Sequence, residues 1–223
     1  MRCEMNNDLR DFIMILKNEN RSEALRYILK LKESQDLSII EVYEELLTPA
    51  LNEMDQTNNE NIDIWREHVR TSIIRTIMEN MVPFLEEERK AFGPPKEETA
   101  AVLCPPDEYH DVGARMAADA LTIGGDRTIF VGSNTPFRVF EAGLAAGNIK
   151  YVAISVSNPY HLVSTRRIID GIRASHPQVQ IILGGNAVQR HPDMAEILKP
   201  DRIARSLHDL TDLEGGDLHG TGL

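Results

Sequence analysis

The spacing of apolar residues changes near residue 95, and this change limits the chain to a few folds. From Met5 to about Lys90 the apolar residues recur at helical spacing, with almost no glycine. Beyond residue 98, short apolar runs alternate with helical segments. The stretch between them, Gly93-Pro94-Pro95, cannot continue a helix. The sequence therefore predicts a helical domain, a linker and an α/β domain.

Four helices are predicted in the first domain, residues 1–92. The second helix begins at the capping pattern Asn20 to Glu23, and the third begins at the capping box Ser38 to Glu41. The fourth is expected over about 63–89, with a kink at Pro83. Four helices joined by short loops predict an antiparallel four-helix bundle.

The second domain, residues 99–213, is predicted to follow a linker at 93–98. The expected strands lie at 99–104, 127–132, 149–156, 179–184 and about 201–205. The expected helices lie near 111–123, 137–146, 161–175, 189–198 and 206–213. Strands joined by helices imply right-handed crossovers, so a doubly wound five-stranded parallel sheet with the flavodoxin-like strand order is predicted. Residues 214–223 are expected to form a flexible tail.

Charge and cysteine content exclude several classes of protein. The formal net charge of −11 argues against direct nucleic-acid binding, which needs clustered Lys and Arg. Two cysteines, Cys3 and Cys104, are too few for a disulfide framework or a zinc site. Because no apolar stretch resembles a signal peptide or a membrane span, a cytoplasmic protein without a membrane contact is expected.

Unusual polar residues follow three of the predicted strands. In a doubly wound sheet, ligands bind outside the carboxyl ends of the strands, at the switch point between the first and third strands. The candidate residues at these ends are Glu108, His110, Ser155, Ser157, Gly184, Gly185 and Asn186. A histidine with a carboxylate two residues earlier is typical of a metal ligand oriented by a hydrogen bond. Adjacent glycines allow a ligand to approach the backbone closely.

The order Glu108-x-His110-x-x-Gly113, Ser155-x-Ser157 and Gly184-Gly185 resembles the corrinoid-binding signature of the cobalamin-dependent methionine synthase and photoreceptor superfamily. The resemblance implies that His110 is the lower ligand of cobalt, and that the serines and glycines line the channel for the displaced nucleotide tail. Residues 131–136 are similar to the family's exit from the second strand. The flanking residues included in the expected cofactor site are Tyr109, Asp111, Val112, Ser133, Thr135 and Asn186.

The helical half is similar to the same family's four-helix bundle, which covers the upper face of the corrin. The segments that carry this resemblance are Leu47-Thr-Pro49-Ala-Leu51 and Glu67-His68-Val-Arg-Thr71. It implies cofactor contacts from Trp65, Glu67 and His68, with His68 a second candidate cobalt ligand. Structural alternatives are a buried hydrogen bond between helices for Glu67 or His68, and packing for Trp65. Light-sensing relatives carry a tryptophan before the Glu-His pair, where this chain has Gln56-Thr-Asn-Asn59.

Several residues of the second domain also have ordinary structural interpretations. A histidine such as His110 often caps a helix or bonds a loop. Ser155 and Ser157 could cap the following helix, and Asp111 could be an acid favoured by the helix dipole. Gly184-Gly185 could be an ordinary turn between strand and helix.

The resemblance implies a protein that holds cobalamin base-off and His-on, in methyl, adenosyl or hydroxo form, and that is not catalytic alone. A stand-alone sensor or regulator is favoured, because Glu108 in place of aspartate and the Arg115 to Asp119 segment are more similar to the sensor branch. The alternative is a methyl-carrying corrinoid subunit that works with a methyltransferase. A weaker alternative is a haem-binding relative that uses His110. A homo-oligomer is left open.

Overall fold

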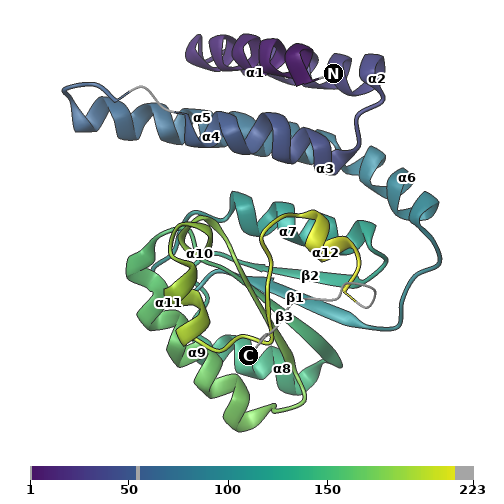
Figure 1. Cartoon of the computed structure of the whole chain (residues 1–223), viewed down its shortest axis with the longest axis vertical. Coiled ribbons are helices and arrows are strands. Elements are labelled where there is room, and N and C mark those ends of the chain that lie inside the picture. Colours follow the sequence, from purple (N-terminus) through teal and green to yellow (C-terminus); the bar gives the residue numbers. More distant parts are fainter. Residues whose placement is uncertain (1, 54–55, 214–223) are drawn as a thin grey trace. The chain divides into compact units, whose positions relative to one another are not determined.

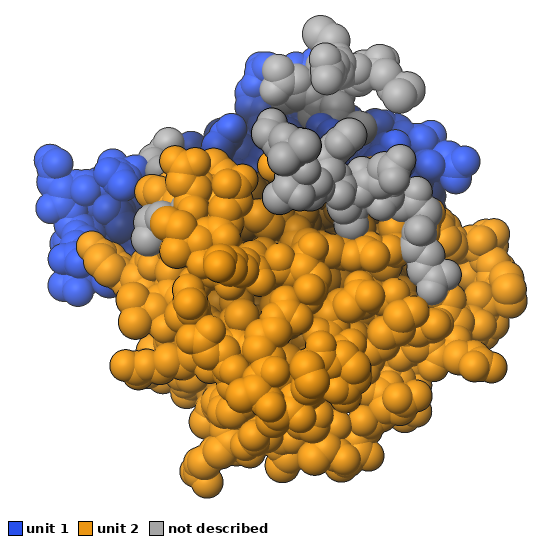
Figure 2. Space-filling model, turned by 60° about the horizontal axis from the view of Figure 1, so that its bottom comes forward, with its two compact units in different colours: residues 1–88 blue, residues 89–223 orange. Residues whose placement is uncertain are grey.

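The computed structural model describes residues 2–53 and 56–213, so the predicted tail at 214–223 lies outside the described residues. The chain divides into two compact units, Met1–Glu88 and Arg89–Leu223, which Figure 2 colours separately. Within the described ranges, every helix is too short or too polar to cross a lipid bilayer.

Unit 1 is helical throughout its secondary structure. Its helices are α1 (Arg2–Lys17), α2 (Arg21–Gln35), α3 (Ile39–Glu41), η1 (Val42–Leu47), α4 (Thr48–Asn52), α5 (Glu60–Asn80) and the first part of α6 (Val82–Phe92). The segments α3, η1 and α4 follow one another without a break (Figure 1). Because α1 packs on α2, η1 and α4, and α5 packs on α2 and α4, the helical bundle is confirmed.

The predicted helix starts of unit 1 are confirmed in detail. Asn20 accepts a hydrogen bond from the Glu23 N–H at 3.1 Å. Ser38 and Glu41 form a reciprocal capping box, in which each side chain bonds the other residue's backbone N–H. Between α4 and α5, the buried Arg70 donates to the carbonyl oxygens of Ala50 and Glu53 at 2.7 Å each. These bonds satisfy carbonyl groups at the end of α4.

Two proline residues explain departures from regular helix in unit 1. The turn η1 is π-helical, and Thr48 N–H bonds the carbonyl of Tyr43. Pro49 follows at once and has no N–H to donate, so the widened turn accommodates it. The predicted fourth helix is divided at Met81 into α5 and α6, with Pro83 in the first turn of α6. Proline is tolerated there because first-turn N–H groups have no partner within the helix.

Unit 2 contains the predicted doubly wound sheet. Its strands in the described residues are β1 (Thr99–Leu103), β2 (Arg127–Gly132), β3 (Ile149–Ser155), β4 (Gln180–Gly184) and β5 (Arg202–Ile203). All neighbouring strands are parallel, in the order β2-β1-β3-β4-β5. The strand order therefore reverses between β1 and β3, where a ligand site is expected.

Helices cover both faces of this sheet (Figure 1). They are α7 (Val112–Ile123), α8 (Phe137–Ala146), η2 (Pro159–His161), α9 (Leu162–Ser175), α10 (Asn186–Arg190), α11 (Pro192–Ile197) and α12 (His208–Thr211). Helices α7 and α12 pack together, and α8 packs on α9. A buried core joins β1, β3 and β4 to α8 and α9, with Leu103, Ile154 and Leu183 among its residues. The sheet is thus a rigid base for the loops at its carboxyl edge.

One helix predicted in unit 2 is divided into two helices in the structure. A single helix was expected over 189–198, whereas α10 and α11 are separated at His191. The ring of Pro192 disfavours helical backbone at the preceding residue, and His191 accordingly has φ −131° and ψ 64°. The helix therefore ends before Pro192 and a new one begins at it.

Candidate functional site

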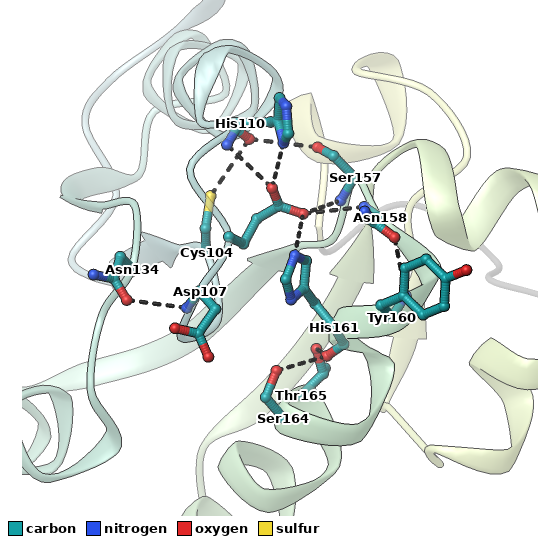
Figure 3. A network of polar contacts seen from close by, with 11 residues as sticks. Cys104, Asp107, His110, Asn134, Ser157, Asn158, Tyr160, His161, Ser164 and Thr165 are labelled. Atoms are coloured by element: carbon teal, nitrogen blue, oxygen red, sulfur yellow. Dashed lines mark hydrogen bonds and ion pairs between the residues drawn. The ribbon is translucent and has the colours of Figure 1, made fainter.

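The side chain of Glu108 lies at the centre of the loops that leave β1 and β3. It is fully buried, with 0% of its surface exposed. One carboxylate oxygen, Oε1, contacts His110 Nδ1 at 2.7 Å and accepts from the His110 N–H at 3.1 Å. The other, Oε2, accepts from the N–H groups of Ser157 at 3.1 Å and Asn158 at 3.0 Å. A single carboxylate thus joins the two loops at the switch point (Figure 3).

Hydrogen bonds keep the Glu108 carboxylate ionised. Burial by itself raises the pKa of Glu108, but bonds from the His110 ring, the His110 N–H and the Asn158 N–H outweigh it and lower the pKa to about 2. An ionised carboxylate only accepts hydrogen bonds, so His110 Nδ1 must carry the proton that lies between them. In the neutral imidazole this leaves the lone pair on Nε2, the nitrogen that can bind a metal.

The ring of His110 is held at one nitrogen and accessible to a ligand, because its side chain is 59% exposed. The predicted hydrogen bond between the His110 ring and the Glu108 carboxylate is therefore confirmed. The N-cap residue of α7 is Asp111 rather than His110. No group of three or more His, Cys, Asp or Glu side chains suited to a metal ion occurs among the described residues. The one oriented and exposed imidazole of His110 fits a metal whose other ligands come with a cofactor.

The loop after β2 supports the His110 loop from the other side. Asn134 Oδ1 accepts from the Asp107 N–H at 3.0 Å, and Asn134 N–H donates to the Glu108 carbonyl at 2.9 Å. The Asn134 side-chain amide also donates to the hydroxyl of Tyr109 at 3.3 Å. Sequence reasoning included Ser133 and Thr135 and passed over Asn134, the residue between them that makes these bonds. Thr135 is buried and donates from Oγ1 to the Gly132 carbonyl at 3.2 Å.

The serines at the end of β3 do not cap α9. Ser157 contributes its N–H to Glu108, and its hydroxyl donates to the His110 carbonyl at 3.4 Å. Ser155 is buried, and a Cβ added at Gly113 would lie 3.8 Å from its hydroxyl oxygen. The capping residues are instead Asn158 for η2 and His161 for α9. Both serines therefore lie at the β1–β3 switch point, as the sequence predicts.

The two glycines after β4 have different environments. A Cβ added at Gly185 would lie 2.5 Å from the Val156 carbonyl oxygen, and Gly185 has φ +103°. A Cβ added at Gly184 would make only ordinary contacts, 3.5 Å from the nearest atom of Ala204. Val156 N–H donates to the Gly184 carbonyl at 2.9 Å, which holds the two loops together. Asn186 begins α10 at this edge.

Residues 98–205 match the family of the B12 binding domain. This match covers the sheet and the loops that hold Glu108, His110, Ser157 and Gly185. Residues 98–205 therefore belong to the B12 binding domain family. Its cofactor is cobalamin, a corrinoid that contains cobalt, and the match favours a corrinoid over the haem interpretation.

The solved structure of a corrinoid protein shares the fold. A monomethylamine corrinoid protein from Methanosarcina barkeri matches with a TM-score of 0.75 at 15% identity, over 93% of this chain and 97% of that one. A cobalamin-binding protein from Desulfitobacterium hafniense DCB-2 matches with a TM-score of 0.49 at 14% identity, over 92% and 96% of the two chains. No curated protein sequence matches the chain. At these identities the structural likeness concerns the fold alone.

Gly185 gives the cobalamin-binding domain a testable structural requirement. We expect Gly185→Ala to destabilise the apo-protein by about 3 kcal/mol, because the backbone conformation is one that only glycine adopts readily and the Cβ would overlap Val156. Gly184→Ala is the matched control and should cost less than about 1 kcal/mol. Urea unfolding of the two variants measures both values. Equal destabilisation by both substitutions would contradict this assignment.

Three further residues near His110 have defined structural surroundings in this cobalamin-binding domain. Cys104 is buried at the end of β1, and burial, with smaller effects from the carboxylates of Glu108 and Asp111, raises the pKa of its thiol to about 12. The thiol is therefore protonated and is not a nucleophile. Asp111 is the N-cap residue of α7 and accepts from the Arg115 N–H through its carbonyl. Val112 is buried at the first position of α7.

Sequence reasoning missed a second histidine beside Glu108. His161 Nε2 lies 4.0 Å from Glu108 Oε2, on the side opposite His110 (Figure 3). The signal available in the sequence was a histidine two residues after the Asn158-Pro159 pair that follows the third strand. Such a residue lies at the carboxyl edge of the sheet, as the other candidates do.

In unit 1, the candidate residues on α5 are more exposed than expected. Trp65 is 62% exposed, and its indole N–H donates to Glu19 at 3.3 Å, so the packing interpretation is wrong. His68 is exposed, which excludes a buried hydrogen bond for it, and Glu67 is half-buried. Glu67 lines a surface depression of about 480 Å³ together with Gln56 and Asp63. Cofactor contacts by Trp65, Glu67 and His68 stay predictions from the resemblance.

Proposed function

We propose that this chain holds cobalamin base-off with His110 as the lower cobalt ligand, and that it carries a methyl group for a separate methyltransferase. The observation that supports His110 as the ligand is its exposed ring, fixed at Nδ1 by the buried Glu108 carboxylate. This is the arrangement that metal-binding histidines use to present the second ring nitrogen to a metal. When bound, a corrinoid cobalt accepts and releases an axial alkyl group.

The residues that would hold the cofactor follow three strands, β1, β3 and β4, at one edge of the sheet. Under the proposal, Ser155, Ser157, Gly184 and Gly185 line the space for the nucleotide tail. The structure supports this because Gly184 leaves room at the backbone and Ser157 lies beside His110. The tail would then leave the cobalt, and His110 would take its place.

The contacts of α7 remove the sequence argument for a sensor. Arg115 and Asp119 suggested the sensor branch in the sequence, but they form an ion pair within α7 at 3.2 Å. Arg115 also lies over the ring of Phe130, 5.7 Å from its centroid. These contacts give both residues a structural role that a sensor and a methyl carrier would need equally. The fold likeness to a monomethylamine corrinoid protein over 93% of this chain supports the choice of a methyl carrier.

The ligand assignment can be tested by electron paramagnetic resonance. Protein labelled with ¹⁵N-histidine is loaded with unlabelled hydroxocobalamin and reduced to the cobalt(II) form. A lower ligand from the protein splits each cobalt line into a doublet, whereas the cofactor's own base gives a triplet. We expect the doublet, and a triplet would overturn the proposed binding mode.

The carrier proposal is tested separately from the binding mode. The loaded protein is reduced to the cobalt(I) form with titanium(III) citrate and incubated with a corrinoid methyltransferase and monomethylamine, so that a methyl cation would pass to cobalt(I) and ammonia would leave. Cofactor absorption is followed in the dark. We expect the absorption of methylcobalamin to appear with time. The adenosylcobalamin form is illuminated in parallel and its oligomeric state is measured by gel filtration. A light-dependent change of oligomeric state without methylation would instead support a sensor.

A further inference from the structure

The buried carboxylate of Glu108 lies between two histidines that come from different loops. His110 contacts Oε1 at 2.7 Å, and His161 Nε2 lies 4.0 Å from Oε2. Glu108 is fully buried, and the side chain of His161 is 20% exposed. A separation of 4.0 Å is too long for a hydrogen bond but is short for an electrostatic interaction in a buried site.

The chain fixes the position of His161 with several short bonds. Asn158 Oδ1 accepts from the Tyr160 N–H at 3.1 Å, and the Asn158 carbonyl accepts from the His161 N–H at 3.0 Å. The His161 carbonyl accepts from the hydroxyls of Ser164 at 2.9 Å and Thr165 at 2.8 Å. The His161 side chain makes no capping bond to α9. Its backbone is therefore anchored, while its ring is directed to Glu108.

We propose that His161 is a positioning residue that acts through Glu108 on His110. Residues 157–161 present two N–H groups and an imidazole to Oε2, so these three polar neighbours of the oxygen come from one loop. Those neighbours oppose rotation of the carboxylate and thus keep Oε1 on His110 Nδ1. The Nδ1–H tautomer of His110, which leaves Nε2 able to bind a metal, is stabilised as a result.

The test compares His161→Gln, which keeps an N–H group near the position of Nε2, with His161→Met, which has a similar length and no such group. In the apo-protein, long-range ¹H–¹⁵N correlation spectra report the tautomer of His110. We expect a mixture of tautomers in His161→Met and mainly the Nδ1–H form in wild type and His161→Gln. Because this readout needs no cofactor, it is independent of the proposed function.

A second readout rests on the proposed function and uses bound cobalamin. The ratio of His-on to His-off cofactor, measured by paramagnetic resonance, should fall about tenfold in His161→Met and recover in His161→Gln. His176→Met, at the other end of α9, is the control and should match wild type. Wild-type behaviour of His161→Met in both readouts would overturn the role of His161. Absence of the His-on signal from wild type would instead overturn the binding mode, and the tautomer experiment would still decide the role of His161.

Discussion

Replacement of His110 by alanine is expected to abolish the doublet from ¹⁵N-labelled histidine in the cobalt(II) spectrum of the bound cofactor. The buried Glu108 carboxylate holds the His110 ring at Nδ1, and the ring is exposed to solvent. Alanine leaves no ring at this position, so water or the cofactor's own base must take the lower position on cobalt. Loss of a metal ligand should cost at least about 10–100-fold in cofactor affinity, since loss of a supporting partner alone has that effect.

The control for this substitution is His176→Ala. His176 is the C-cap residue of α9, at the end opposite His161, and its backbone N–H bonds the Ile172 carbonyl. It should leave both the spectrum and the affinity unchanged. Affinity is measured by titration of the apo-protein with hydroxocobalamin. A doublet that persists in His110→Ala would show that another histidine is the ligand, and His161 and His68 would be the next residues to test.

The sheet could be predicted from the sequence because its strands are buried and separated by clear helical segments. Every residue of β1 is buried, which produces the continuous apolar run after the linker. The π-helical turn η1 was not predicted, since its cause is one proline within an otherwise regular helical pattern. The division of α10 from α11 could have been predicted from Pro192, because the residue before a proline avoids helical backbone.

The candidate site was predictable where the chain order fixes the position of a residue at the sheet edge. Glu108 and His110 follow β1, so their proximity to the loop after β3 follows from the strand order alone. The strand order could not predict that Glu108 is buried. Its carboxylate is enclosed by the loop after β3, where the N–H groups of Ser157 and Asn158 bond to it. The contact of His161 with Glu108 depends on the η2 turn, whose geometry no sequence period indicates.

Replacement of Glu108 by glutamine is expected to destabilise the apo-protein by about 2–4 kcal/mol. The NH₂ group of the glutamine is a donor, and at either of its two positions it would face other N–H donors. The carboxylate accepts on Oε1 from His110 and on Oε2 from the N–H groups of Ser157 and Asn158. The amide NH₂ cannot accept from either pair. If the NH₂ group faces the His110 ring, His110 Nδ1 must become the acceptor and the ring proton moves to Nε2. Nε2 then cannot bind cobalt.

Urea unfolding measures the loss of stability, and the His110 tautomer in the apo-protein shows which way the amide turns. Glu97→Gln, at an exposed position of the same unit, is the control and should change stability by less than about 0.5 kcal/mol. Glu108→Asp keeps the charge on a shorter side chain, so it should retain more His-on cofactor than Glu108→Gln. If Glu108→Gln retained the stability and the Nδ1–H tautomer of wild type, the carboxylate could not be what orients His110. Stability and ligand geometry would then have to depend on the backbone bonds between the loops, such as that from Val156 N–H to the Gly184 carbonyl.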